Sequence, residues 1–120
     1  MSNKSIRKHL LSYKFAARGV WLALFLDQNM RIHFTAAVVV LLTNYLLEIS
    51  RTDWVLSLML IGVVFMAETF NTAIEKLADR VSQERDSLIG QTKDMAAGAV
   101  LIACVVAVIS AIFIYVPYLK

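Results

Sequence analysis

The sequence predicts an all-α integral membrane protein, with one N-terminal amphipathic surface helix and three transmembrane helices in a single domain, residues 1–120. Of its 120 residues, 59% are apolar and only 18% are charged, whereas ordinary soluble domains are roughly 45 to 50% apolar. A chain this short has too much surface for its volume to bury so many apolar side chains in its own core. One proline and four glycines leave little turn chemistry for β-hairpins. As one straight helix the chain would be about 180 Å long, and each crossing uses about 30 Å, so three or four spans are the maximum.

Residues 5–26 form the first predicted element, an amphipathic helix in the plane of the membrane. Apolar residues recur there at steps of three and four, while Arg7, Lys14 and Arg18 share another face. Such a helix suits a membrane surface, where cations meet anionic headgroups and the apolar side lies among acyl chains. The alternative is a solvated basic face on a helix packed against its own protein. Nucleic acid is not an expected partner, because nothing else in the chain has soluble character.

Three transmembrane helices follow in the prediction, at residues 31–48, 53–80 and 92–117. The first is just long enough to cross. The apolar run of the second, residues 54–67, falls short of the hydrocarbon thickness, so this helix must continue into Glu68 at the membrane boundary. The third has no charge from Met95 onward and is the strongest transmembrane signal.

The distribution of basic residues predicts the topology. Of the 12 Lys and Arg residues, six precede the first span and four lie between the second and third, whereas Arg51 and Lys120 stand alone in the other two segments. The positive-inside rule therefore places the N-terminus in the cytoplasm and the C-terminus outside.

Cys104 is the only cysteine, so no intramolecular disulfide and no cysteine metal site is expected. The N-terminus alternates basic and apolar residues, so we expect no cleaved signal peptide.

The second span carries a row of polar side chains on one helix face: Glu68, Asn71, Glu75 and Asp79, spaced by three, four and four. A carboxylate directly after an apolar run is costly unless it is paired or functional, which makes Glu68 a candidate site residue. The later carboxylates also admit a plainer interpretation, the solvated side of a helix that leaves the membrane. Asn71 could simply bond a neighbouring helix.

Three further residues give weaker signals. Lys93 is expected at the start of the third span, where free backbone N–H groups and the helix dipole attract phosphate, although a basic flank of a span would also explain it. Asp27 lies among apolar residues at the end of the surface helix and is a weak signal by itself. His33 is a third candidate, but a histidine in this position more often lies at the level of the lipid headgroups than binds a metal.

The chemistry available to these residues is limited. The sequence contains no glycine-rich nucleotide loop, no HExxH motif and no cysteine cluster. Carboxylates at a membrane face could instead coordinate Mg²⁺ on a nucleotide, because a few hard oxygen ligands suit an ion that keeps waters and substrate phosphates. One free carboxylate could act as a general base. These residues permit phosphoryl transfer, and they also permit ion or proton translocation.

Two blocks of the sequence resemble the prokaryotic diacylglycerol kinase family of small three-span membrane enzymes. They are AETFNTAIEKLADR at residues 67–80 and KDMAAGAVLI at residues 93–102. The total length, the span order and the amphipathic N-terminus agree as well, so the resemblance covers nearly the whole chain. The tract at residues 31–33 and the Ala-Gly-Ala start of the third span are more similar to the undecaprenol kinase branch than to the enterobacterial diacylglycerol kinase branch.

The resemblance implies a homotrimer with shared active sites in the bacterial cytoplasmic membrane. It implies phosphorylation of a lipid alcohol, diacylglycerol or undecaprenol, by ATP with Mg²⁺. Glu68 matches the family's proposed catalytic base and Glu75 its metal and phosphate ligand, while Asp27 stands where the family usually has Glu as a second metal ligand. The other residues assigned to the nucleotide site are Asn71, Glu84, Arg85, Asp86, Lys93 and Asp94, with Phe15 and Lys8 standing where the enterobacterial enzymes have Tyr and Arg.

The sequence therefore leads to one main hypothesis, direct in-line transfer at the cytoplasmic interface. Glu68 accepts the proton of the lipid hydroxyl, which attacks the γ-phosphate, while Glu75 and Asp27 position Mg²⁺-ATP and Lys93 neutralises phosphate charge. The alternatives are a small transporter or channel with Glu68 as an intramembrane proton or cation site, and a purely structural membrane subunit.

Overall fold

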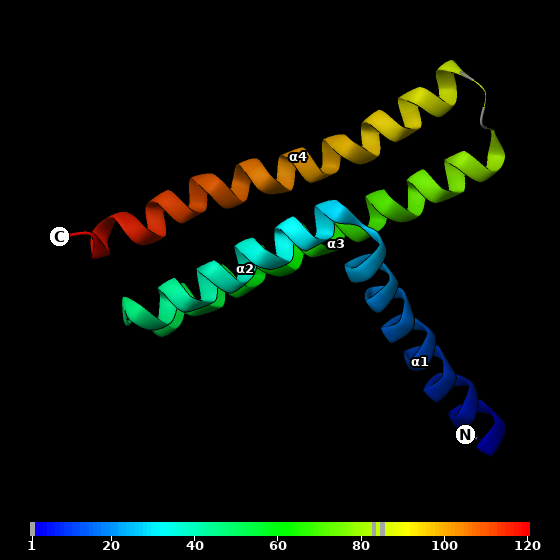
Figure 1. Ribbon diagram of the computed structural model, residues 1–120. Coiled ribbons are helices and arrows are strands. Elements are labelled where there is room, and N and C mark those ends of the chain that lie inside the picture. Colours follow the sequence, from blue (N-terminus) through cyan, green and yellow to red (C-terminus); the bar gives the residue numbers. More distant parts are fainter. Residues whose placement is uncertain (1, 83, 85) are drawn as a thin grey trace.

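The computed structural model describes residues 2–82, 84 and 86–120 of the chain, which form long helices joined by short turns (Figure 1). The helices are α1 (Asn3–Leu26), α2 (Gln28–Leu46), α3 (Arg51–Val81) and α4 (Ser87–Tyr115), and the short 3₁₀ helix η1 (Val116–Tyr118) follows α4. Every regular element in this part of the chain is helical, which confirms the predicted all-α class.

Each α-helix begins at a polar side chain that accepts a hydrogen bond from a backbone N–H of its first turn. The four caps are Ser2, Asp27, Ser50 and Asp86. Such side chains satisfy N–H groups that have no partner within the helix. Short polar residues in an otherwise apolar chain therefore determine where the helices start.

The cap at Asp86 corrects one sequence prediction. Its Oδ1 accepts the N–H groups of Leu88 and Ile89 at 2.8 and 3.4 Å, so α4 begins at Ser87, earlier than the expected start at residue 92. The prediction that Lys93 lies among free N–H groups at a helix start is therefore wrong. Lys93 lies in the second turn of α4, and the Asp86 carboxylate occupies the N–H groups at the helix start.

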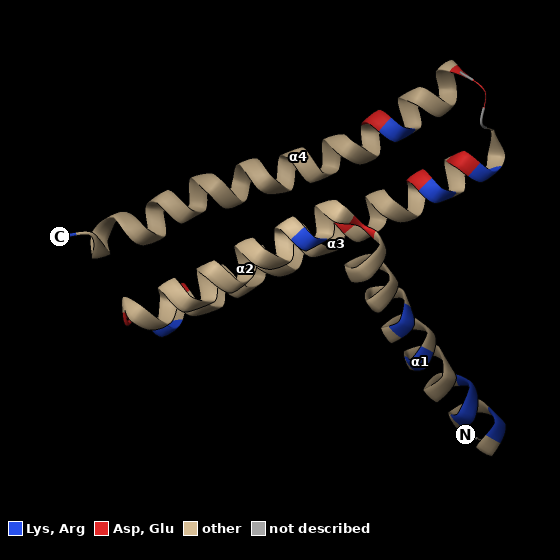
Figure 2. Cartoon of the chain, viewed as in Figure 1, with Lys and Arg blue, Asp and Glu red and all other residues tan. Residues whose placement is uncertain are grey.

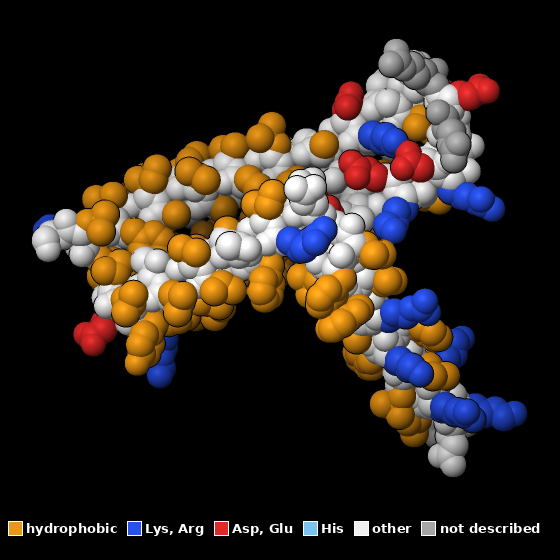
Figure 3. All heavy atoms as spheres, viewed as in Figure 1, with side chains coloured by type: hydrophobic (Ala, Val, Ile, Leu, Met, Phe, Trp, Pro, Cys, Tyr) orange, Lys and Arg blue, Asp and Glu red, His pale blue; other side chains and the backbone are white. Residues whose placement is uncertain are grey.

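The two longest helices, α3 and α4, run antiparallel and form a hairpin (Figure 1). Within the described residues, the segments Arg51–Val81 and Ser87–Tyr118 are the two that are long and apolar enough to cross a membrane. Most of their large apolar side chains face outward, and 77% of Phe113 is exposed. Figure 3 shows these side chains covering the hairpin except near the turn between α3 and α4, where charged side chains gather. An apolar surface of this extent requires a bilayer or further subunits around it.

Helix α2 lies beside α3 and is shorter and more polar. Among the described helices, α2 is not one of those apolar enough to cross a membrane. Its first turn contains the polar residues Gln28, Asn29 and Arg31, and Asn44 lies near its end. The predicted first crossing, residues 31–48, therefore stays a prediction.

Helix α1 diverges from the other helices at Asp27, where the backbone is extended with φ −104° and ψ 118° (Figure 1). Within α1, only Ala23 is buried. The apolar face of α1, including Trp21, is thus exposed, and basic residues follow the helix toward the N-terminus (Figure 2). Within one chain, this arrangement disagrees with the alternative in which α1 packs against its own protein.

At the end of the bundle away from α1, polar side chains join three helices. Asn44 of α2 is fully buried, and its Nδ2 donates to Ser57 Oγ of α3 at 2.8 Å. The hydroxyl of Tyr115 on α4 donates to Asn44 Oδ1. Beyond it, the Tyr118 hydroxyl donates to Asp53 Oδ2 at 2.6 Å. A buried amide in apolar surroundings must be satisfied, so this contact specifies how α2, α3 and α4 align.

The Asn44 contact is testable by a double-mutant cycle. Asn44→Ala, Tyr115→Phe and the double variant should show a coupling free energy of about 0.5 to 1.5 kcal/mol, as for interhelical hydrogen bonds in membranes. The measurement is reversible unfolding in detergent micelles. Thr43→Val is a matched control, because the Thr43 hydroxyl bonds only the carbonyl of Val39 in its own helix. Strictly additive effects would contradict the interhelical bond.

Candidate active site

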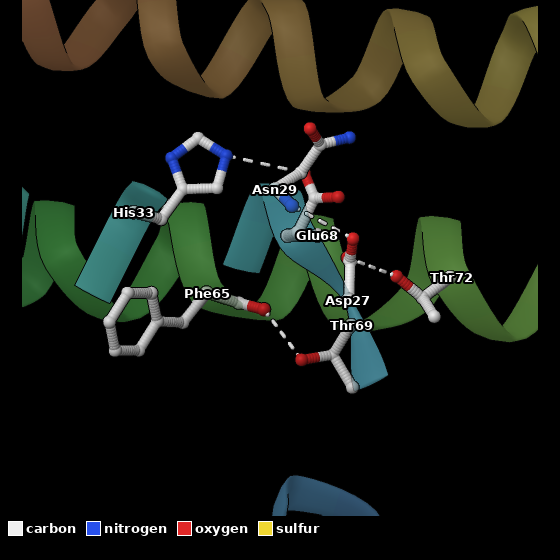
Figure 4. A network of polar contacts seen from close by, with 7 residues as sticks. All are labelled: Asp27, Asn29, His33, Phe65, Glu68, Thr69 and Thr72. Atoms are coloured by element: carbon white, nitrogen blue, oxygen red, sulfur yellow. Dashed lines mark hydrogen bonds and ion pairs between the residues drawn. The ribbon is translucent and has the colours of Figure 1, made fainter. Parts of the chain in front are cut away.

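The site begins at Asp27, the residue that separates α1 from α2. One oxygen of its carboxylate, Oδ1, caps α2 through the N–H of Asn29 at 3.0 Å. The other, Oδ2, accepts a hydrogen bond of 2.6 Å from the hydroxyl of Thr72 on α3 (Figure 4). A single side chain thus ends one helix, starts the next and attaches both to α3.

The carboxyl of Glu68 lies beside this junction and is almost completely buried, with 2% of the residue exposed. Its Oε2 is 3.3 Å from His33 Nε2 on α2 (Figure 4). The carboxyl group of Asp27 is close enough to that of Glu68 for the two charges to act on each other. Two carboxyl groups in such contact hold a proton between them or bind a cation. The structure therefore brings together two of the sequence-predicted site residues, Asp27 and Glu68, from different helices.

The protonation of Asp27 reflects these contacts. Burial works against its ionisation, but the hydrogen bonds that it accepts from the Thr72 hydroxyl and the backbone, together with the neighbouring Glu68, hold the pKa of Asp27 below its usual value. Hydrogen bonds to the charged form of a carboxyl favour that form. Asp27 is thus the partner in the pair that carries the negative charge.

Two buried oxygen acceptors on α3 have no hydrogen-bond partner in the described part of the chain. They are Glu68 Oε1 and Asn71 Oδ1, which lie one turn apart. Buried polar atoms without partners are rare, because each loses its bonds to water and gains nothing in return. Both atoms are acceptors, so a ligand that satisfies them must supply a donor such as a hydroxyl group.

A second polar cluster lies at the turn between α3 and α4, where the charged residues of both helices gather (Figure 2). Lys93 of α4 forms an ion pair with Asp79 of α3. Beside this pair is a hollow of about 530 Å³, whose described lining includes Glu84, Asp86 and Gly90. The exposed Glu75 is close enough for its charge to act on Lys93. Charges of both signs therefore surround a space that is open to solvent.

The structure does not bring every predicted residue to these clusters. Lys8 and Phe15 lie on the exposed part of α1 that points away from the other helices. Asp94 is exposed on α4. Arg85 lies outside the described residues. Among the described residues, no three His, Cys, Asp or Glu side chains gather into a metal site. The sequence hypothesis paired Asp27 with Glu75, whereas in the structure Asp27 lies against Thr72 and Glu68.

Two residues at the site escaped assignment from the sequence. Thr72 lies one turn after Glu68 on α3, so the spacing of the two residues along one helix was enough to predict that they share a face. His33 carried no such signal, because it is 35 positions from Glu68 in the chain and reaches it from another helix. Spacing along the sequence cannot reveal a contact between helices.

Comparisons with known proteins show the family of the chain. Residues 14–115 match the profile of the prokaryotic diacylglycerol kinase family. The undecaprenol kinase of Bacillus subtilis is 34% identical over 114 residues, which cover 95% of this chain and 93% of that protein. A diacylglycerol kinase of Synechocystis is 36% identical over 83% of this chain and 58% of that protein. The diacylglycerol kinase of Escherichia coli K12 is 41% identical over 53% of this chain and 52% of that protein.

The apolar hairpin, the buried carboxyl of Glu68 beside Asp27 and these similarities define a membrane-embedded lipid kinase. The chain belongs to the prokaryotic diacylglycerol kinase family. Membership in a kinase family decides between the interpretations that the polar row on α3 left open, in favour of phosphoryl transfer.

The bond between Thr72 and Asp27 gives a first prediction for this site. Thr72→Val keeps the shape of the side chain but removes the donor to Asp27 Oδ2, and it should lower lipid kinase turnover roughly 10-fold, as for loss of a hydrogen bond to a charged group. Thr72→Ser retains the hydroxyl and should stay within a factor of about two to three of the wild type. Turnover is measured in mixed micelles, and wild-type activity of Thr72→Val would contradict a role for this bond.

Proposed function

We propose that the protein uses Mg²⁺-ATP to phosphorylate the hydroxyl of a membrane lipid alcohol. Undecaprenol is the first candidate substrate, because the undecaprenol kinase of B. subtilis matches nearly the full length of both chains. Diacylglycerol is the second, because relatives that match a smaller part of the chain are diacylglycerol kinases. The observation that carries the proposal is the buried oxygen Oε1 of Glu68, an acceptor without a partner in the described residues, on a carboxyl that lies next to Asp27.

Glu68 is the general base in this proposal. Its Oε1 accepts the proton of the lipid hydroxyl while the hydroxyl oxygen attacks the γ-phosphate in line with the leaving oxygen. A lipid hydroxyl stays at headgroup depth, and Glu68 follows directly on the apolar run of α3. The base therefore lies at the depth where the reacting group of the lipid is found. The amide oxygen of Asn71, one turn further along α3, is a second acceptor that orients groups at the same place.

The hollow between α3 and α4 is the proposed nucleotide site. Its described lining contains three carboxylates, Asp79, Glu84 and Asp86, and a single cation, Lys93. An anionic triphosphate would be repelled by this set unless a divalent cation accompanied it. The charge of the hollow thus supports a requirement for Mg²⁺.

Asp27 and Glu75 are the residues proposed to hold that ion. Both offer carboxylate oxygen, which suits Mg²⁺ together with waters and phosphate oxygens. Asp27 reaches α3 at Thr72, one turn before Glu75, so the two carboxylates meet the same part of the helix. A magnesium ion bound there would neutralise charge on the phosphate groups. Lys93, whose ammonium group is close enough to feel the charge of Glu75, is proposed to neutralise further charge on the phosphate groups.

The proposed topology follows from the same residues. Helix α1 and the segment around the turn between α3 and α4 carry most of the basic residues and lie in the cytoplasm, with three crossings and the C-terminus outside the inner membrane. We further propose a homotrimer. Three helices are too few to enclose both a lipid and a nucleotide, and the exposed apolar faces of α3 and α4 leave room for neighbours.

The experiment that tests this function offers each lipid separately in mixed micelles with labelled ATP. We expect phosphate transfer to undecaprenol, slower transfer to diacylglycerol, and loss of both when magnesium is removed by EDTA. Transfer to neither lipid, with the protein folded and trimeric, would contradict a lipid kinase of this specificity. Faster transfer to diacylglycerol would reverse the order of the two substrates.

Glu68→Gln tests the base. The amide has nearly the same shape but cannot accept the proton, so turnover should fall by about 10² to 10⁴, the usual contribution of general acid–base catalysis. Nucleotide binding should be largely retained, because the hollow that contains Lys93 is unchanged. Near-normal turnover would remove Glu68 as the base.

Glu75→Gln tests the metal site. Loss of one carboxylate should raise the magnesium concentration needed for half-maximal activity about 10-fold or more, because a site with few ligands depends on each of them. Lys76→Gln, next to it on the exposed side of α3, is a charge-changing control. An unchanged magnesium dependence in Glu75→Gln would count against its role as ligand.

A further inference from the structure

The side chain of His33 joins α2 to the buried carboxyl of Glu68. Its Nε2 is 3.3 Å from Glu68 Oε2, and the contact bridges two helices (Figure 4). The other carboxyl oxygen, Oε1, is buried and has no partner in the described residues. The two oxygens of the proposed base are therefore not equivalent: a protein group holds one, and the other is available.

The surroundings of His33 leave its ring few alternatives. His33 lies at one end of an apolar cavity of about 200 Å³ between α2, α3 and α4, lined near the ring by Ala37, Val64 and Phe65. Glu68 is its only side-chain partner among the described residues. An imidazole in apolar surroundings directs its N–H to whatever acceptor is present. The packing of the three helices therefore directs the His33 ring toward Glu68.

We propose that His33 is a positioning residue that fixes the conformation of Glu68, and this role rests on the proposed function of Glu68 as the base. A neutral imidazole carries its proton on one ring nitrogen, and donation to an ionised Glu68 requires that nitrogen to be Nε2. The bond holds Oε2 and turns Oε1 toward the lipid hydroxyl. A glutamate side chain has several rotatable bonds, so without this bond Oε1 would spend less time in the reactive orientation.

Neighbouring charges do not supply the same restraint. Asp27, the other polar neighbour of Glu68, is an acceptor bound by Thr72 and by the start of α2. Once both carboxyl groups are ionised, Asp27 repels Glu68 instead of holding it. In the state that is ready to take a proton, His33 is therefore the donor that keeps the Glu68 side chain in place.

Kinetics of three single variants test this role. His33→Leu places an apolar side chain without a donor in the apolar surroundings, so kcat should fall roughly 10- to 100-fold with little change in the KM for ATP. His33→Gln offers an amide N–H and should restore a large part of kcat. Thr35→Val is the matched control on α2, because the exposed Thr35 hydroxyl bonds only the carbonyl of Arg31, and it should leave kcat unchanged. Equal loss in the Leu and Gln variants would overturn the role of the donor.

A spectroscopic measurement separates this role from the proposed function. In the full chain labelled with ¹⁵N-histidine in bicelles, the ring signals of His33, assigned by their loss in His33→Leu, should show the tautomer with the proton on Nε2. Glu68→Gln should shift these signals, while those of the other histidine, His9, stay in place. Signals of His33 that do not respond to Glu68→Gln, or a ring with its proton only on Nδ1, would overturn the contact whether or not the protein phosphorylates a lipid.

A double variant completes the test. If His33 acts only through Glu68, adding His33→Leu to Glu68→Gln should cause no further loss of the residual turnover. A purely structural role for His33 would instead give the same fold-loss in both backgrounds and would contradict positioning.

Discussion

The carboxylate of Asp27 holds together the part of the molecule on which its chemistry depends. It ends α1, caps α2 through Asn29 and accepts the hydroxyl of Thr72 on α3. Because one side chain makes all these contacts, the direction in which α1 leaves the bundle and the approach of α2 to α3 are determined together. The same approach places His33 against Glu68 and so encloses the carboxyl that we propose as the base.

Polar contacts are concentrated at the two ends of an otherwise apolar bundle. One end holds Asp27, Glu68 and His33, and the other holds the buried bonds of Asn44 with Ser57 and Tyr115. Apolar helices in lipid gain little from burying apolar surface against one another, because the lipid tails offer the same environment. A few satisfied polar contacts can therefore determine the alignment of helices that could otherwise slide along their axes.

In the proposed function, the distribution of charge separates the tasks of the two substrates. Glu68 lies at the end of an apolar run, where the hydroxyl of a lipid can reach it, whereas Lys93 and its acidic neighbours line a hollow that is open to water. A nucleotide cannot enter the hydrocarbon and a lipid does not leave it, so a kinase for such a pair of substrates must work at the boundary. Helix α3 spans this boundary without a break from Arg51 to Val81, and it therefore connects both parts of the site.

Composition, charge distribution and motifs were sufficient to predict an all-helical membrane protein and the family, because these depend on residue types and on spacing along one helix, whereas the role of Glu68 stays a prediction. The start of α4 was misplaced after Gly90-Gln91-Thr92, since the sequence did not reveal that Asp86 caps the helix. Only the tertiary structure decided that Asp27 meets Glu68 and Thr72, that His33 holds one oxygen of Glu68, and that α1 leaves Lys8 and Phe15 away from both clusters. The physical reason is that these contacts join side chains on different helices, and their geometry depends on how the helices pack and where they turn.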